Sequence, residues 1–466
     1  MIMGIRSAFA VMCGKFTAKM LHIMGRGGTS LPGVVTLKLC PNVLGALAKD
    51  IKVICVTGTN GKTTTCHAIT DILTANGYTC LSNEAGANML NGVVSCFMNA
   101  ASLTGKVKRD YAVLECDEAS LRHITRSFGK LDVTVVVTNV FRDQLDRYGE
   151  VLTTLDLIKQ GLANVPQTSL VLNADCSLTS SLAETTEHKD VTFFGVNTSF
   201  DNTSSTDISD AVYCIKCKTK YKYRSHTFGH LGDFYCENCG YHREKPFVAI
   251  EQVKQFKAAS AEVVMSIDGS SYDAKITLPG AYNLYNGLAA AAIGKTIGLD
   301  DKTVISSMSK LTTPFGRMEH IPLTDKGVEM ILVKNPAGFN EVISFLTAHC
   351  TGEDDILFGL NDNSADGTDV SWIWDVEFEK LSERIKEISA EKQTYYFTGK
   401  RGEDLEVRLK YAGFDTSKFQ LDKDYRTLIQ TLKGTGRHTY MVLSYTVMLA
   451  FRDKLGEVVE LKKYAR

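Results

Sequence analysis

The sequence predicts an α/β fold: a central domain with a parallel sheet and an inserted metal-binding module, then a second, Rossmann-like α/β domain. Three observations lead to this fold class. A short apolar run at 52–56 precedes a glycine-containing loop and a helical pattern, later apolar runs alternate with helical segments, and two Cys-x-x-Cys pairs interrupt the series. At 466 residues, the chain is long enough for two or three domains.

The N-terminal segment 1–50 is predicted to be helical and to pack on the central domain. Its apolar runs are interrupted by Arg6, Lys15, Lys19 and Arg26, so none reaches the ~20 apolar residues that a membrane span needs. The spacing fits an amphipathic helix with basic residues on one side. Contact with a membrane surface is therefore an open alternative.

The central domain is predicted to occupy residues 51–320. Strands are expected at 52–56, 111–115, 133–139 and 169–173, and their near-continuous apolar character suits a sheet buried on both faces. After Phe200 a polar run and a cysteine-rich block indicate an insert at 212–245. The run EMILVKN at 329–335 is a new strand candidate and places a C-terminal α/β domain at 321–466.

Composition excludes some functions and indicates a compartment. A net charge of −1 with 23% charged residues argues against a general nucleic-acid binder. The thirteen cysteines are scattered from Cys13 to Cys350 without a disulfide framework, which fits a reducing compartment. We therefore expect the chain to lie in the cytoplasm.

The loop TGTNGKTTT at 57–65 is the strongest functional signal. Backbone NH groups around Gly58 and Gly61 can surround a phosphate, Lys62 can reach the outer phosphates, and Thr63 can bind Mg²⁺. The dipole of the helix that follows favours the same anion. The predicted nucleotide contacts in this loop are Gly58, Thr59, Asn60, Gly61, Lys62, Thr63 and Thr64.

The two pairs CIKC at 214–217 and CENC at 236–239 predict a closed zinc ribbon. Four thiolates at this spacing suit a tetrahedral Zn²⁺ ion. The predicted ligands are Cys214, Cys217, Cys236 and Cys239. Because four cysteines complete the coordination shell, the neighbouring His226, His230 and His242 are expected at the surface.

The stretch VTGTNGKTTT resembles the ATP loop of the Mur ligase family, whose members join amino acids to peptidoglycan precursors through an acyl-phosphate. Glu115 in YAVLECDE stands where the family carries a magnesium-binding glutamate, and NLYNGLAAAA resembles the segment that contacts adenine. FGRMEH and KNPAG resemble the end of the central domain and the start of the C-terminal one. The resemblance implies ATP and Mg²⁺ as cofactors, with Lys62 and Glu115 as catalytic residues. Further contacts are implied for Asn283, Asn286, Arg317, Lys334 and Asn335.

The chain also departs from the family pattern. TNVFRDQLDRYG resembles the stretch in which the family has Asn and then Asp-His-Leu-Asp, but Gln144 stands where a magnesium-binding histidine is expected. Ile331 and Lys334 replace the usual aspartate and histidine. Lys159 falls where some members carry a carbamoylated lysine, but the prediction here is an ordinary exposed helical lysine, with carbamoylation as the alternative.

A Mur-like core with a four-cysteine insert, followed by KNPAG and NDNSADGTDVSWIWD, is similar to one branch of that family, the ligase-like subunits of lipid II isoglutaminyl synthases. The resemblance implies ATP-dependent amidation of the D-glutamate α-carboxylate in the lipid II stem peptide, with ammonia from glutamine. It implies a heterodimer in which a class I glutaminase of the GatD type contacts the C-terminal domain. The lipid-linked substrate would bring the chain to the inner face of the cell membrane.

The acidic stretch 361–375 is then expected to serve the partner. Asp369 is predicted to supply, in trans, the carboxylate that orients the glutaminase histidine, while Asp362 and Asp366 are predicted to be turn and capping residues. A loop that only solvates the surface is the alternative.

Two other functions remain open at the level of sequence. The chain can be a self-sufficient ligase that adds a free amino acid, or a non-catalytic ATP-binding scaffold. Intact Lys62, Thr63 and Glu115 count against the scaffold.

Overall fold

The computed structural model describes residues 5–24, 30–83, 87–102, 105–142, 151–185, 188–199, 210–257, 260–312, 317–388 and 392–461. The chain divides into two compact units. The first comprises residues 1–141 and 150–312, and the second comprises residues 142–149 and 313–466. Each unit is built around one large sheet.

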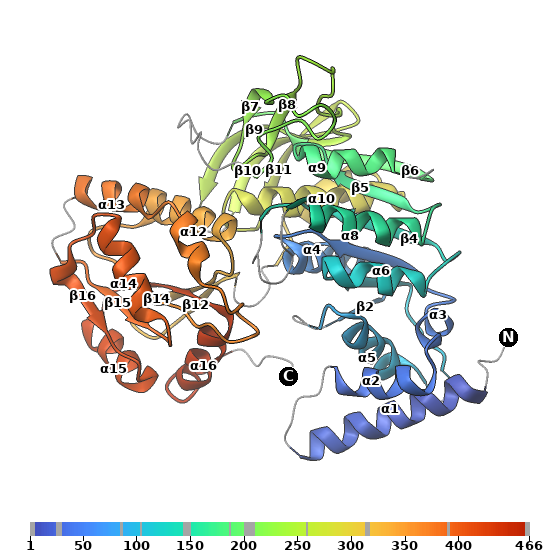
Figure 1. Ribbon diagram of the computed structural model, residues 1–466, viewed down its shortest axis with the longest axis horizontal. Coiled ribbons are helices and arrows are strands. Elements are labelled where there is room, and N and C mark those ends of the chain that lie inside the picture. The colour runs from blue at the N-terminus through green and yellow to red at the C-terminus, as the bar shows by residue number, and fades with distance from the viewer. Residues whose placement is uncertain are drawn as a thin grey trace. The chain divides into compact units, whose positions relative to one another are not determined.

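A nine-stranded sheet forms the centre of the first unit (Figure 1). Its strand order is β11-β10-β9-β6-β5-β4-β1-β3-β2. Neighbours from β2 to β9 are parallel, and β9, β10 and β11 form an antiparallel edge. The strands are β1 Lys52–Thr57, β2 Cys80–Ser82, β3 Tyr111–Glu115, β4 Val133–Val137, β5 Ser169–Asn173, β6 Asp190–Val196, β9 Val248–Lys257, β10 Ser260–Ile267 and β11 Ser270–Ile276.

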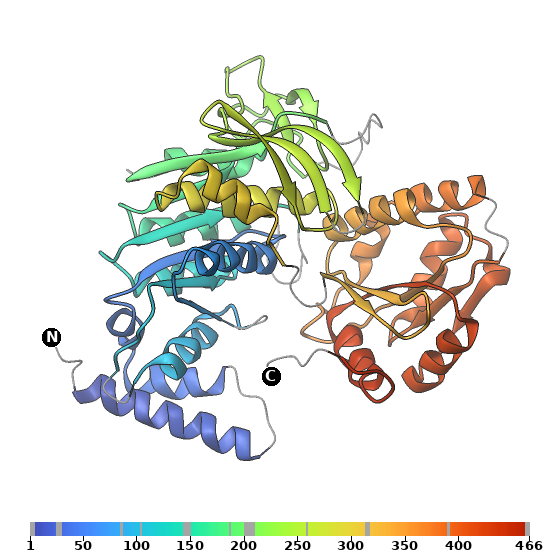
Figure 2. The ribbon, with the colours of Figure 1, turned by 180° about the vertical axis from the view of Figure 1, so that it is seen from behind.

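Helices cover both faces of this sheet. Helices α6 and α8 lie on one face (Figure 1), and α4 and α10 lie on the other (Figure 2). The central strands are therefore buried along their length, as their apolar runs predicted. The helices are α4 Lys62–Ala75, α5 Leu90–Ala100, α6 Glu118–Arg126, α8 Val151–Ala163, α9 Ser177–Ser180, α10 Tyr282–Thr296 and α11 Asp301–Met308.

Three helices precede the sheet: α1 Ile5–Ile23, α2 Leu31–Leu39 and α3 Val43–Leu47. Helix α1 packs on α2, and α2 packs on α5. Ala10, Val11 and Gly14 are buried in this contact. A Cβ atom on Gly14 would lie 2.1 Å from Thr36 Oγ1, so the glycine lets the two helices approach. No helix in the described residues is both long enough and apolar enough to cross a membrane.

The insert of the first unit contains an antiparallel hairpin, β7 Lys222–His226 and β8 Gly232–Tyr235. Its small core consists of Tyr221, Phe234 and Tyr241 together with two cysteine side chains. The Tyr241 hydroxyl donates a hydrogen bond to the Ser177 carbonyl over 2.9 Å, which attaches this core to α9.

The second unit has a six-stranded sheet in the order β12-β13-β17-β14-β15-β16, with helices on both faces. Only β12, at one edge, runs antiparallel to its neighbour. This α/β architecture confirms the predicted fold class. The elements are β12 Arg317–Ile321, β13 Val328–Leu332, α12 Pro336–His349, β14 Asp355–Gly359, α13 Phe378–Glu387, β15 Tyr395–Thr398, α14 Gly402–Tyr411, β16 Phe419–Leu421, α15 Tyr425–Thr435, β17 Thr439–Leu443 and α16 Tyr445–Leu455.

Candidate functional site

The predicted site residues of the first unit gather at the carboxyl end of β1. Strand β1 lies between β3 and β4, so the chain crosses to opposite sides of β1 at this point. Ligands of open α/β sheets bind at such a switch point. The residues that follow the three strands therefore meet: the loop 58–61 after β1, Glu115 at the end of β3, and residues 138–141 after β4.

Two glycines determine the shape of the loop. Gly58 and Gly61 have φ angles of +119° and +85°, which other residues rarely adopt. A Cβ atom would lie 2.4 Å from Thr138 Oγ1 at Gly58, and 2.1 Å from Asn286 Oδ1 at Gly61. Helix α4 starts directly afterwards, at Lys62, so its positive dipole end adjoins the loop. This is the arrangement that binds phosphate.

Residues after β4 hold the loop in place, although the sequence did not assign them to the site. The Asn60 carbonyl accepts hydrogen bonds from Thr138 Oγ1 at 2.7 Å and from Asn139 Nδ2 at 3.1 Å. The Asn60 NH group donates to Asn139 Oδ1 at 2.9 Å. Thr59 Oγ1 exchanges two hydrogen bonds with the backbone of Phe141. The loop is therefore preorganised, which reduces the entropic cost of binding a nucleotide.

Lys62 is buried and points back over the loop. Its Nζ donates to the Gly58 carbonyl at 2.6 Å, to the Thr59 carbonyl at 3.3 Å, and to Glu118 Oε1 at 2.8 Å. Glu118, in the first turn of α6, is also buried. Glu118 was not among the predicted site residues, and its only signal in the sequence is its place three residues after Glu115. The ammonium group is thus positioned beside the loop by a carboxylate.

Next to Lys62, Thr63 and Glu115 are hydrogen-bonded to each other and offer two oxygen atoms that can bind a metal ion. Thr63 Oγ1 donates to Glu115 Oε2 at 2.8 Å, and Asn88 Nδ2 donates to Glu115 Oε1 at 3.1 Å. Asn83 Oδ1 accepts from the Glu115 NH group at 2.8 Å, which fixes the end of β3. A carboxylate and a hydroxyl next to a phosphate loop are donors that suit Mg²⁺. These residues fit the metal that the resemblance implies.

Helix α10 approaches the loop from the other side. Asn286 Nδ2 donates to Asn283 Oδ1 at 2.7 Å, and Thr65 Oγ1 donates to Asn286 Oδ1 at 3.2 Å. Both asparagines are buried. Thr64, predicted as a contact, is also buried, within the first turn of α4. Asn286 therefore lies against the loop and is bonded to Asn283 behind it, while the contact of these asparagines with adenine remains a prediction.

Three further predicted contacts belong to the second unit. Asn335 is the N-cap of α12, and its Oδ1 accepts from the Gly338 NH group at 2.8 Å. Lys334 directly precedes it and is half-buried. Arg317 begins β12, where its backbone pairs with Ile331. Their roles in nucleotide binding remain predictions.

Two further positions of the family pattern are those of Gln144 and Lys159. Gln144 lies outside the described residues. Lys159 is in α8, where its Nζ lies 3.7 Å from Asp156 Oδ1 in a partly exposed pair. This contact is of the kind that an ordinary helical lysine makes.

The acidic stretch 361–375 lies between β14 and α13. Asp369 is half-buried, and its Oδ1 accepts a hydrogen bond from the Ser371 NH group at 2.8 Å. This bond lowers the pKa of the Asp369 carboxyl. The next residues contain two buried anchors, Trp372 and Ile373, whereas Trp374 is 51% exposed. The loop is therefore fixed on one side of Asp369.

Asp362 and Asp366, two of the other three aspartates in this stretch, make different contacts. Asp366 is buried, and its two carboxylate oxygens accept from the NH group and the hydroxyl of Thr446, in the first turn of α16. Asp362 Oδ2 lies 3.6 Å from a nitrogen of Arg401. Asp366 therefore has a structural role, because it joins the loop to the start of α16.

The four cysteines of the insert come together. Their sulfur atoms all lie within 4.8 Å of one another, as a single tetrahedral ion would require. Hydrogen bonds from Thr219 lower the pKa of Cys217 to about 5, which favours the thiolate that binds metal. The predicted four-cysteine cluster of Cys214, Cys217, Cys236 and Cys239 is thus confirmed, and its donors suit zinc.

The prediction that His230 lies at the surface is wrong. Its side chain is fully buried, with Nε2 at 3.4 Å from Cys176 Sγ and its ring 4.5 Å from the Phe141 ring. The reason is that the loop between β7 and β8 folds inward onto the unit. Because Phe141 holds Thr59 of the phosphate loop, the cysteine insert packs against a residue that positions that loop.

A second contact joins the insert to α10. The Tyr285 hydroxyl of α10 donates to buried Asp175 at 2.5 Å and hydrogen-bonds to Thr227 of the insert at 2.8 Å. Arg243 Nε, beyond the last cysteine, donates to the other Asp175 oxygen at 2.6 Å. Burial raises the pKa of Asp175 despite these partners. The insert thus contacts elements on both sides of the phosphate loop.

Comparison with known proteins identifies the family. The family model "Mur ligase middle domain" matches residues 56–240, and "MurT ligase C-terminal" matches residues 332–448. The curated Streptococcus pneumoniae "Lipid II isoglutaminyl synthase (glutamine-hydrolyzing) subunit MurT" is 33% identical over 97% of this chain and 98% of its own length. The chain belongs to the MurT family of Mur ligases. The Staphylococcus aureus MurT subunit is 31% identical over 98% of this chain and 99% of its own.

Solved structures share the fold of this MurT-family chain. MurF from Acinetobacter baumannii superposes with a TM-score of 0.64 at 15% identity, over 91% of this chain and 81% of that one. Mycobacterium tuberculosis folylpolyglutamate synthase gives a TM-score of 0.60 at 13% identity, over 97% of this chain and 100% of that one. These likenesses confirm the Mur ligase-like architecture.

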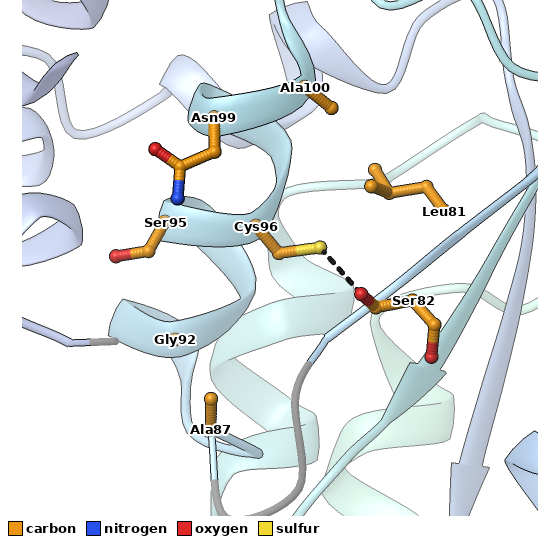
Figure 3. A pocket seen from close by; sticks show the side chains of 8 residues that line it. All are labelled: Leu81, Ser82, Ala87, Gly92, Ser95, Cys96, Asn99 and Ala100. Atoms are coloured by element: carbon orange, nitrogen blue, oxygen red, sulfur yellow. Dashed lines mark hydrogen bonds between the residues drawn. The ribbon is translucent and has the colours of Figure 1, made fainter. Parts of the chain in front are cut away.

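The first unit also has a pocket of about 240 Å³ between β2 and α5 (Figure 3). Cys96 Sγ lies 3.2 Å from the Ser82 carbonyl on one side of it. The lining residues are Leu81, Ser82, Ala87, Gly92, Ser95, Cys96, Asn99 and Ala100. Because none of them is charged, this pocket is unsuited to a triphosphate and differs from the loop site.

Proposed function

We propose that this chain is the ATP-dependent ligase subunit of a two-subunit amidotransferase. Its proposed substrate is the α-carboxylate of the D-glutamate in the lipid II stem peptide, which becomes D-isoglutamine. The observation that carries the proposal is the full-length likeness to curated MurT subunits, at 33% and 31% identity. The geometry around the phosphate loop supports the ATP-dependent step.

The first proposed step activates the carboxylate, because a free carboxylate is a poor acyl donor. An oxygen of the substrate carboxylate attacks the γ-phosphorus of ATP, ADP leaves, and an acyl-phosphate forms. Lys62 would offset the charge of the phosphoryl group during transfer. Thr63 and Glu115 would hold Mg²⁺, which supplies a counter-charge to the phosphate oxygens.

The second proposed step forms the amide. The lone pair of ammonia attacks the acyl carbon, the C–N bond forms, and phosphate leaves with the electrons of the C–O bond. Loss of one proton from nitrogen completes the amide. Water must be excluded until ammonia arrives, since it would hydrolyse the acyl-phosphate.

The ammonia is proposed to come from a separate GatD-like class I glutaminase. Such an enzyme needs an accessible cysteine next to a histidine. The described part of the chain contains one close Cys–His contact, Cys176 with His230, but both side chains are fully buried. His230 Nδ1 also has no hydrogen-bond partner among the described residues, so no carboxylate orients the ring. These observations support a glutaminase site on another subunit.

An exposed aromatic pair near Asp369 supports docking of that partner on the second unit. Trp374 and Tyr411 are 51% and 74% exposed, and their ring centroids are 5.7 Å apart. The Arg408 guanidinium lies 5.5 Å from the Trp374 ring and is itself buried, so it supports the ring from within the unit. Trp and Tyr side chains are enriched at the energetic centres of protein interfaces. We propose that the glutaminase covers this surface.

We expect Asn139→Ala to weaken ATP binding by roughly tenfold to a hundredfold, because it removes two hydrogen bonds that hold the Asn60 backbone. Isothermal titration with a non-hydrolysable ATP analogue measures the effect. Asn76→Ala is the matched control, since Asn76 caps the opposite end of α4. Equal affinities in the two variants would contradict the role of Asn139.

We expect one tightly held zinc ion per chain. Elemental analysis of protein purified without chelator should find it in the wild type and in a Cys96→Ser control, but not after Cys217→Ser. Loss of zinc should unfold the insert, because metal binding supplies much of the folding energy of such modules. Limited proteolysis between residues 210 and 245 measures that unfolding. A metal-free wild type, or a disulfide among the four cysteines, would reject the zinc assignment.

Copurification from the native cell tests the proposed function as a whole. The chain should bring down a glutaminase, and the complex should amidate lipid II in the presence of glutamine and ATP. ATP turnover driven by a free amino acid without any partner would instead favour a self-sufficient ligase. A partner complex without ATP turnover would favour the scaffold.

A further inference from the structure

Helix α1 carries an apolar stripe that the protein leaves exposed. Six large side chains recur at spacings that place them along one side of the helix and just past its end. Phe16 and Ile23 are 67% and 68% exposed. The full stripe consists of Phe9, Met12, Phe16, Met20, Ile23 and Met24. From Phe9 to Ile23 it is about 21 Å long at 1.5 Å per residue.

The stripe is not the face by which α1 packs on the protein. That contact uses Ala10, Val11 and Gly14, on the opposite side of the helix. Figures 1 and 2 both show α1 at the outer edge of the first unit, with α2 next to it. Soluble surfaces rarely expose contiguous apolar patches without a binding role. The exposed stripe therefore indicates a surface that binds a partner or a membrane.

Charge indicates what that occupant is. Residues 1–49 contain six lysines and arginines and no aspartate or glutamate, a net charge of +6. The whole chain has a net charge of −1, so residues 50–466 carry −7. Lys19 is exposed and lies three residues after Phe16 and four before Ile23, beside the stripe. The segment that carries the exposed stripe thus has a net positive charge, whereas the rest of the chain has a net negative one.

We infer that the apolar stripe of α1 binds the surface of an anionic phospholipid membrane, with the helix lying in the plane of the interface. Apolar side chains enter the boundary of the acyl chains while basic residues attract the headgroups. A second copy of this chain fits less well, because two segments of +6 would repel each other. This inference rests on the proposed function, whose substrate is lipid-linked, and gives the chain its own means of reaching that substrate.

Vesicle binding of the full chain, purified with any partner that accompanies it, tests the inference. The probe is vesicles of phosphatidylglycerol and phosphatidylcholine in equal amounts, without lipid II, with pure phosphatidylcholine vesicles for comparison. We expect cosedimentation with the anionic vesicles, weakened by salt. Phe16→Glu with Ile23→Glu should lower the partition coefficient at least tenfold, and Lys19→Gln, which removes one positive charge, about fivefold.

The control is Val458→Glu, which changes a side chain that is 44% exposed in the second unit and should bind vesicles like the wild type. Circular dichroism should be unchanged in all variants, because every altered side chain is exposed. Equal binding of the double variant and the wild type, or no binding by either, would overturn the inference. So would a wild-type dimer that the double variant abolishes, since the stripe would then join two copies. Failure here with normal amidation of a water-soluble lipid II analogue would leave the proposed function intact.

Discussion

Lys62→Ala should abolish amidation while leaving glutamine hydrolysis by the complex. The Lys62 ammonium lies beside the phosphate loop, within 2.6 Å of the Gly58 carbonyl, where it can meet the transferring phosphoryl group. One well-placed charge of this kind is worth about 3–4 kcal/mol in the transition state, or ~10²–10³ in rate. Glutaminase activity should persist because its nucleophile is proposed to lie on the partner.

The ion pair of Lys62 complicates this substitution and suggests its control. Alanine would leave Glu118 buried without its cation, and breaking a buried pair can cost about 3–5 kcal/mol. Lys62→Ala should therefore also lower the melting temperature. The double variant Lys62→Met with Glu118→Gln removes both charges and should recover stability without recovering activity.

Phosphate release with ATP, and thermal denaturation of the same preparations, separate the two effects. If the double variant is stable and still amidates at the wild-type rate, Lys62 takes no part in the mechanism. Recovery of activity in step with recovery of stability would give the ion pair a structural role only.

The fold could be predicted from the sequence because its signals are local. The apolar runs at 111–115 and 169–173 coincide with β3 and β5, since strands covered on both faces must be apolar throughout. The spacing of the glycines in the phosphate loop and of the two Cys-x-x-Cys pairs likewise predicts a phosphate-binding loop and a four-cysteine cluster. Each of these signals lies within about ten to twenty-five residues of sequence.

The rest of the site could not be predicted, because it depends on contacts between distant segments. Glu118 reaches Lys62 across 56 positions, and Asn139 reaches Asn60 across 79. His230 was predicted to be exposed, because its sequence does not indicate that the turn between β7 and β8 folds inward. Helix α1 is apolar on two sides, so its sequence alone did not tell which side the protein buries.

Asp369→Asn should lower glutamine hydrolysis by the complex about 10³–10⁴-fold, as in triads that lose their carboxylate. The carboxylate would fix the tautomer of the partner's histidine and stabilise its charged form. Asp369 suits this role because it is partly exposed, forms no ion pair among the described residues, and is oriented by the Ser371 NH group. Asparagine retains the shape and one oxygen, so complex formation and ATP binding should be unchanged.

The neighbouring aspartates supply matched controls for this test, and glutamate release is the measurement. Asp366→Asn should mainly destabilise the second unit, because the Asp366 carboxylate bonds the first turn of α16 through Thr446. Asp362→Asn should leave hydrolysis within a few-fold of normal, because a 3.6 Å pair with Arg401 in a partly exposed position contributes little. A collapse of hydrolysis in Asp362→Asn, with a normal rate in Asp369→Asn, would transfer the role to that neighbour. Normal rates in both would show that the partner completes its triad without this loop, and the exposed Trp374–Tyr411 pair would then explain docking alone.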